Sequence, residues 1–74
     1  MRFALRVTNA PLDYPIWIEC FHPDYLDNPF KTSYPSQATL LTTMQALNIK
    51  NLLQDDELEL VNEEELQVYI LMSS

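Results

Sequence analysis

The clearest helical period in the chain lies in residues 36–48. Four apolar side chains recur there at i, i+1, i+4 and i+7, which places them on one side of an α-helix: Leu40, Leu41, Met44 and Leu47. Ser36 is the predicted N-cap, and Asn48 is the best available stop in a chain without glycine. We therefore predict one helix, with the last three of those four apolar residues in the core.

Four other segments alternate between apolar and polar residues, as half-buried strands do. They are residues 2–8, 16–21, 57–61 and 65–72. In the second segment Glu19 favours the wet face, so we expect the alternate residues to form the core face: Ile16, Ile18 and Cys20. In the third segment Leu58 and Leu60 should point inward, with Glu57 and Glu59 outward.

Residues 65–72 allow two interpretations. Their β-branched and aromatic content favours a strand with Leu66, Val68, Ile70 and Met72 on one face. The competing interpretation is a helix capped by Asn62, with a glutamate at the third helical position in a capping-box pattern. We prefer the strand because both the alternation and the intrinsic preference support it.

The connections carry the proline residues. Residues 9–15 and 22–35 contain all five prolines of the chain and read as loops. The second loop is long for so small a domain, and its spaced aromatics predict that it packs against the body. Residues 49–54 fit a short strand, a single turn or an extension of the helix.

The predicted order is therefore strand, strand, helix, strand, strand. Its simplest packing is a two-layer α+β domain over residues 1–74, with one helix on a mostly antiparallel four-stranded sheet. This ββαββ order is similar to that of ubiquitin-like β-grasp folds. That likeness is an analogy of fold only, because a common fold hosts unrelated functions.

Size and cysteine content set further bounds. Seventy-four residues, 47% of them hydrophobic, are enough for one small core without a structural metal. The single cysteine excludes an intramolecular disulfide and fits a reducing compartment. The start of the chain has no secretory pattern, and its longest apolar run is too short to span a bilayer. We expect a soluble cytoplasmic protein.

The net charge of −7 bears on the partner. It argues against direct contact with nucleic acid, where neutralising phosphates supplies most of the affinity, and against anionic membranes. It is compatible with a partner that has a basic surface.

The chain contains no glycine, which lowers the prospects for most enzyme classes. Phosphate-binding loops, dinucleotide fingerprints and nucleophile elbows need the backbone freedom of glycine. Cys20, His22 and Asp24 form the one stretch that resembles a metal or cysteine-based site, but a buried structural cysteine explains it better. We therefore predict no catalytic residues, no metal and no cofactor.

Two groups of residues are candidates for partner binding. The first is the acidic block over residues 55–65, whose chosen members are Glu57, Glu59, Glu63, Glu64 and Glu65. It forms either an acidic docking surface or a solvated strand face that discourages edge pairing. The second is aromatic, because interfaces are enriched in such side chains: Trp17, Phe21, Tyr25 and Phe30. These aromatics either contact a partner or are covered by the loop over residues 22–35.

The function that fits these patterns is a non-enzymatic protein-interaction module. We expect it to act as an inhibitor that occludes the basic, nucleic-acid-binding surface of a larger protein complex. Small acidic phage anti-defence proteins, such as anti-CRISPR and anti-restriction proteins, are the model for this class. The alternative is a structural or accessory subunit that forms a homo-oligomer through an exposed strand face.

Overall fold

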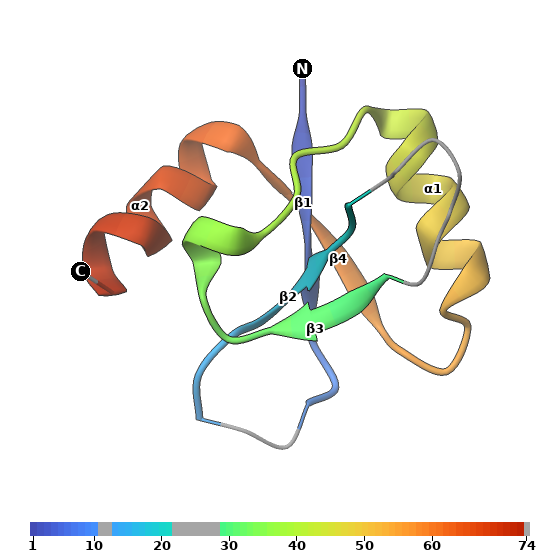
Figure 1. Cartoon of the computed structure of the whole chain (residues 1–74), viewed down its shortest axis with the longest axis horizontal. Helices are drawn as coiled ribbons and strands as arrows, with labels where there is room; N and C mark the ends of the chain where they lie inside the picture. Colours follow the sequence, from blue (N-terminus) through green and yellow to red (C-terminus); the bar gives the residue numbers. More distant parts are fainter. Residues whose placement is uncertain (11–12, 22–28, 74) are drawn as a thin grey trace.

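The protein is a four-stranded antiparallel sheet with a helix on each side (Figure 1). The computed structural model describes residues 1–10, 13–21 and 29–73. In chain order the elements are β1 (Phe3–Val7), β2 (Ile16–Glu19), β3 (Phe30–Thr32), the 3-10 helix η1 (Pro35–Gln37), α1 (Thr43–Leu52), β4 (Leu58–Asn62) and α2 (Glu63–Ser73). The strand order is β3-β2-β1-β4, and every pair is antiparallel. The predicted α+β class and the four-stranded sheet are confirmed.

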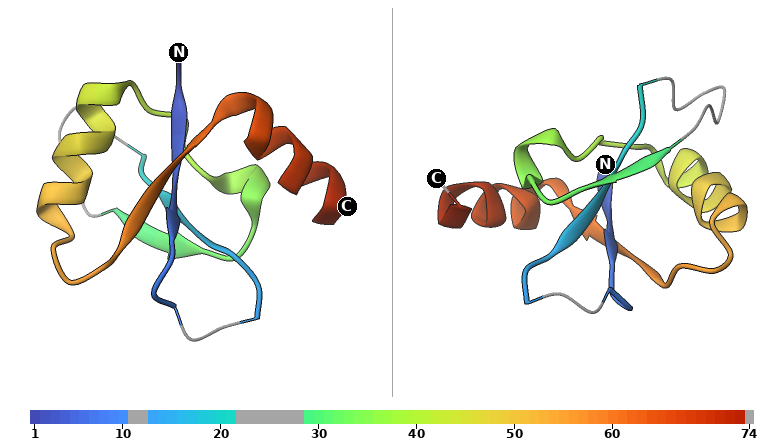
Figure 2. Two further views of the ribbon diagram at one scale, coloured as in Figure 1. Left: turned by 180° about the vertical axis from the view of Figure 1, so that it is seen from behind. Right: turned by 60° about the horizontal axis from the view of Figure 1, so that its bottom comes forward.

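β1 lies inside the sheet and sends side chains to both faces. Its Leu5 and Val7 are buried on the α1 side, whereas Ala4 is buried on the α2 side. The same alternation divides β2, where all three of its first residues are buried. Figure 2 shows α1 and α2 on opposite sides of the strongly twisted strands. The sheet is therefore the middle of three layers rather than one of two.

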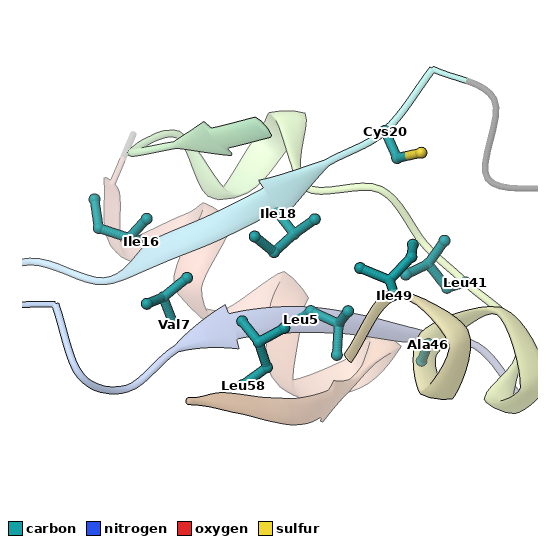
Figure 3. Close-up of a cluster of buried hydrophobic side chains, with 9 residues drawn as sticks. All are labelled: Leu5, Val7, Ile16, Ile18, Cys20, Leu41, Ala46, Ile49 and Leu58. Carbon is teal, nitrogen blue, oxygen red and sulfur yellow. The ribbon is translucent and has the colours of Figure 1, made fainter. Parts of the chain in front are cut away.

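The larger core lies between the sheet and α1. It is almost entirely aliphatic and comprises Leu5, Val7, Ile16, Ile18, Cys20, Leu41, Ala46, Ile49 and Leu58 (Figure 3). The prediction that Ile16, Ile18 and Cys20 form the core face of the second strand is confirmed. Burial of such side chains is the main free-energy gain available to a domain of this size.

The smaller core lies under α2. Its fully buried members are Ala4, Trp17, Val61 and Leu66, and Ala38, Leu40, Tyr69 and Ile70 pack around them. Leu40 and Leu41 are neighbours in the chain but belong to different cores. This happens because the chain is extended just before α1, so successive side chains point to opposite sides.

The observed helix begins and ends later in the chain than the predicted helix over residues 36–48. Residues 35–37 form η1 instead, and α1 begins at Thr43 with Thr42 as its N-cap. Thr42 Oγ1 accepts from the Gln45 backbone N–H at 3.2 Å, and Gln45 Oε1 accepts from the Thr42 N–H at 2.9 Å, a complete capping box.

The later start rotates the buried stripe of α1. Its buried residues are Ala46 and Ile49, with Leu53 packed beside them. Burial of Leu41 is confirmed, but the predicted burial of Met44 and Leu47 is wrong, because these side chains are 68% and 46% exposed.

Residues 65–72 are helical, so the strand prediction is wrong and the competing interpretation is correct. The Glu65 backbone N–H donates to Asn62 Oδ1 at 2.8 Å, which satisfies one of the free donors at the start of α2. Leu66, Tyr69 and Ile70 then fall at i, i+3 and i+4 and pack on the sheet. Within the described residues, no helix is long and apolar enough to cross a membrane.

The fourth strand of the sheet comes from inside the predicted loop. β3 pairs with β2, with Glu19 opposite Phe30 and Trp17 opposite Thr32. The element order is therefore β-β-β-α-β-α, apart from η1, and the predicted ββαββ order with one helix is wrong. The analogy with β-grasp folds rested on that order and no longer applies.

Candidate interaction surface

The predicted acidic residues lie where β4 continues into α2. Asn62 is both the last residue of β4 and the cap of α2, so Glu63, Glu64 and Glu65 form the first turn of the helix. All three are exposed. Carboxylates are favourable at this position because the N-terminal end of a helix carries partial positive charge. These glutamates therefore stabilise the helix as well as charge the surface.

Glu57 and Glu59 occupy the strand end of the same surface, and both are exposed. The backbone N–H of Glu57 donates to Asn9 Oδ1 at 3.2 Å, and its carbonyl oxygen accepts from the Thr8 N–H at 2.8 Å. Its carboxylate is not an ion-pair partner of any described residue. Glu59 lies opposite Arg6 in the sheet, with 4.0 Å between Arg6 Nη1 and Glu59 Oε2. That contact is long and partly exposed, so it neutralises Glu59 only weakly.

We call these five residues the acidic surface: Glu57, Glu59, Glu63, Glu64 and Glu65. The rise of an extended strand places Glu57 roughly 20 Å from Glu63, so the charges form a line rather than a cluster. At the helical end, Met1, Asn62, Glu63 and Glu64 line a hollow of about 410 Å³. Carboxylates beside an open hollow are suited to contact with a lysine or arginine side chain.

The predicted aromatic group is divided by the fold. Trp17 is fully buried, so of its two predicted interpretations the covered one holds, with α2 packed against it. Phe21 and Phe30 are 70% and 41% exposed, and their ring centroids lie 5.2 Å apart. Tyr25 lies outside the described residues. Within the described part of this aromatic group, only Phe21 and Phe30 form an exposed contact.

Trp17 instead helps to hold α2 on the sheet. Its ring meets the Tyr69 ring edge-on, with centroids 5.1 Å apart. Arg6 Nη1 donates to Tyr69 Oη at 3.3 Å, and its guanidinium carbon lies 5.9 Å from the centre of that ring. Such contacts between aromatic rings and between a cation and a ring each stabilise by about 0.5–1.5 kcal/mol. Arg6, Tyr69 and Trp17 thus fix the orientation of α2 and of the glutamates at its start.

The described residues offer little for metal or nucleophilic chemistry. No group of three or more His, Cys, Asp or Glu side chains in the described ranges is placed to hold a metal ion. Cys20 is buried, and its backbone N–H donates to Thr39 Oγ1 at 2.7 Å. His22 and Asp24 lie outside the described residues, so the site predicted as unlikely there remains untested.

Sequence reasoning missed a second kind of surface, the exposed apolar side chains of the helices. On α2 these are Val68, Leu71 and Met72, and on α1 they are Met44, Leu47 and Leu52. The signal was present for α2, because residues 66–72 are apolar at almost every position and one side of a helix cannot bury them all.

No protein-family model, curated protein or solved structure matches the chain.

Proposed function

We propose that this protein is a non-enzymatic interaction module that binds a basic, nucleic-acid-binding surface of a larger protein complex and blocks it. Phage anti-defence proteins of the anti-CRISPR and anti-restriction type are the class that this activity resembles. The observation that carries the proposal is the acidic surface, whose five glutamates are all exposed from the residue before β4 to the first turn of α2.

The physical basis is competition for positive charge. A groove that binds nucleic acid is lined with lysine and arginine, which meet closely spaced phosphates. A line of carboxylates about 20 Å long on a strand and the helix that follows it can occupy part of such a groove. Complementary charge would also speed the encounter, because opposite fields steer association.

The chain keeps little positive charge to counter this surface. It has four Lys and Arg residues against eleven Asp and Glu residues. Among the described residues, Arg6 and Lys31 are engaged with Glu59 and Asp56. The ion pairs of the described ranges leave Glu57 and the three glutamates of α2 without a cationic partner. These four charges are therefore open to a basic partner.

The alternative of a homo-oligomer formed through an exposed strand face has lost much of its basis. Both faces of β1 and β2 are covered, one by α1 and one by α2. Pairing of two β4 edges would bring Glu57 and Glu59 close to the same residues of the second copy, and like charges across strands are unfavourable. A homo-oligomer would have to use the helices or the β3 edge instead.

The test is capture of partners from the native host, using the full chain as bait and identifying bound proteins by mass spectrometry. Glu64→Lys is the test variant, and Glu19→Lys on β2 is the control with the same change in net charge. We expect capture to fall several-fold with Glu64→Lys and with rising salt, while Glu19→Lys retains it. Because Glu19 lies opposite Phe30, loss of capture in Glu19→Lys alone would instead indicate the Phe21–Phe30 end and contradict the proposal.

A further inference from the structure

The outer side of α2 joins the acidic surface to an apolar one. Glu64, Val68 and Leu71 follow at i, i+4 and i+7 and so lie along one line of the helix, away from the buried Leu66. Val68, Leu71 and the neighbouring Met72 are 54%, 72% and 76% exposed. Figures 1 and 2 show α2 at the edge of the molecule, with no other element over its outer side. We call this line, with Met72, the α2 outer face.

A groove borders the α2 outer face on the Met72 side. One hollow of about 450 Å³ is lined by Tyr14, Tyr34, Pro35 and Ile70, among others. A second hollow of about 220 Å³ shares Tyr14 and Pro35 and is lined also by Tyr69 and Met72. Tyr14 and Tyr34 are themselves 52% and 63% exposed. Apolar surface therefore continues from α2 across the groove to the segment around Pro35.

We propose that the α2 outer face binds an amphipathic helix of the partner protein, one that carries lysine or arginine at one end and apolar side chains at the other. This inference rests on the proposed function and specifies which part of the basic partner is recognised. A helix is the fitting occupant because the backbone groups of α2 are bonded within the helix and offer no strand edge, so contact must be made by side chains.

The charge of α2 favours such a partner over a second copy of this chain. Helix α2 begins with three glutamates, of which Glu64 lies on the α2 outer face, and its last turn contains no basic residue. Two copies packed through this face, in either direction, would place those carboxylates beside like charges or apolar groups. A lysine or arginine of a foreign helix would instead pair with Glu64 while its apolar residues cover Val68 and Leu71. One partner would thus both cover the exposed apolar area and pair with the charge of Glu64.

The spacing of the face fixes the pattern expected of the partner. Glu64 and Leu71 are seven residues apart, or roughly 10 Å along the helix axis. A partner helix that packs along the same line should therefore place its basic residue about two turns from its outermost apolar residue. Side chains at the apolar end are in reach of the groove beside Met72.

The test uses a synthetic peptide helix of alanine, leucine and lysine with its lysines confined to one end, and a matched peptide with glutamate in place of lysine. Binding to the full chain is measured by fluorescence anisotropy of labelled peptide, and the contacted residues by amide chemical shifts. The test variant is Val68→Gln with Leu71→Gln. Gln keeps a good helix propensity, so α2 should remain folded. Met44→Gln with Leu47→Gln is the matched control on α1, where both side chains are also exposed.

We expect the lysine peptide to bind wild type and the α1 control equally, and to bind the α2 variant at least tenfold more weakly. The glutamate peptide should not bind. The inference is overturned if the lysine peptide fails to bind wild type, if the α2 variant binds it as well as wild type does, or if sedimentation shows a dimer that the α2 variant dissolves. A salt-sensitive capture from the host that depends on Glu64 but not on Val68 and Leu71 would overturn this inference alone and leave the proposed function standing.

Discussion

The two helices cover opposite faces of one sheet, but different chemistry holds each in place. α1 is fixed by aliphatic packing, since Ala46 and Ile49 are fully buried among seven other residues of the larger core. α2 buries only Leu66 completely, and the rest of its anchorage comes from Tyr69 against Trp17 and Arg6. Both helices also expose apolar side chains, but only α2 begins in a run of acids.

This difference separates stability from recognition. A helix held by an aliphatic core contributes to folding wherever its buried side is intact, and its outer side is free to vary. Helix α2 is oriented by the contacts of Tyr69 with Trp17 and Arg6, and its outer side carries the acidic and apolar residues proposed to bind a partner. We therefore expect mutations in α1 to act mainly on stability and mutations on the outer side of α2 to act mainly on binding.

The largest effect should come from Ile49→Ala in α1. Removal of a fully buried aliphatic side chain costs about 2–5 kcal/mol of unfolding free energy, a large part of the total for a domain of this size. Leu47→Ala on the same helix should cost less than about 1 kcal/mol, because that side chain is about half exposed. Urea unfolding followed by circular dichroism measures both. Equal costs would mean that α1 does not pack as described.

Leu66→Ala should rank second and report on α2 alone. We expect a loss of about 2–4 kcal/mol, because Leu66 is the one fully buried residue of this helix. Trp17, the only tryptophan of the chain, lies in the same cluster and provides an intrinsic probe. Loosening of α2 should shift its fluorescence emission to the red below the main unfolding transition, whereas Ile49→Ala should not. An unshifted emission in Leu66→Ala would contradict the weaker anchorage of α2.

The sequence predicted the sheet better than the helices, for a physical reason. Alternation located β1, β2 and β4 to within about two residues, because one face of each strand had to be apolar. β3 was not predicted, because its three residues are too few to show an alternating pattern. It becomes a strand through its pairing with β2, which is a tertiary contact. For the helices, the local caps were the better guide. The pair Thr42 and Gln45 marks the start of α1, and Asn62 marks the start of α2 against the strand preference of Val68 and Ile70.

The candidate site was predicted in part. Exposure of the five glutamates followed from charge alone and is confirmed. The sequence leaves burial of Trp17 open, because it depends on α2 lying over the second face of the sheet, whereas the pattern of residues 65–72 predicts a strand. The same error hid the α2 outer face, since a strand would have directed Val68 and Met72 to the core. The strand prediction for residues 65–72 was therefore wrong about two regions: the surroundings of Trp17, on the inner side of α2, and the residues of the α2 outer face.

The two N-caps allow a comparison in which the expected losses of stability are smaller and nearly equal. Thr42→Ala and Asn62→Ala each remove a side-chain acceptor that serves the first turn of a helix, at 3.2 Å in α1 and 2.8 Å in α2. Each should cost about 1 kcal/mol. The two variants should differ more in local opening of the first helical turn than in global stability. Hydrogen exchange of the first-turn amides measures this local opening. We expect faster exchange in Asn62→Ala than in Thr42→Ala, because α2 has fewer buried side chains to hold a frayed turn. The opposite ranking would show that α2 is the better anchored helix.

The smallest expected effect tests whether charge holds α2 in place. If Leu66 and Tyr69 provide the anchorage, the Glu59–Arg6 pair should contribute little, since its atoms are 4.0 Å apart and the side chains are 51% and 33% exposed. Glu59→Gln should then change the unfolding free energy by less than about 1 kcal/mol, and by the same amount as Glu57→Gln within about 0.5 kcal/mol. The small difference in unfolding free energy between these two variants should vanish in 1 M salt, where charges are screened beyond roughly 3 Å. A cost for Glu59→Gln that is much larger and persists in high salt would mean that Glu59 orients Arg6 under Tyr69. In that case Glu59 would belong to the support of α2 rather than to the acidic surface, and Glu57 would be separated from the open charges of the helix.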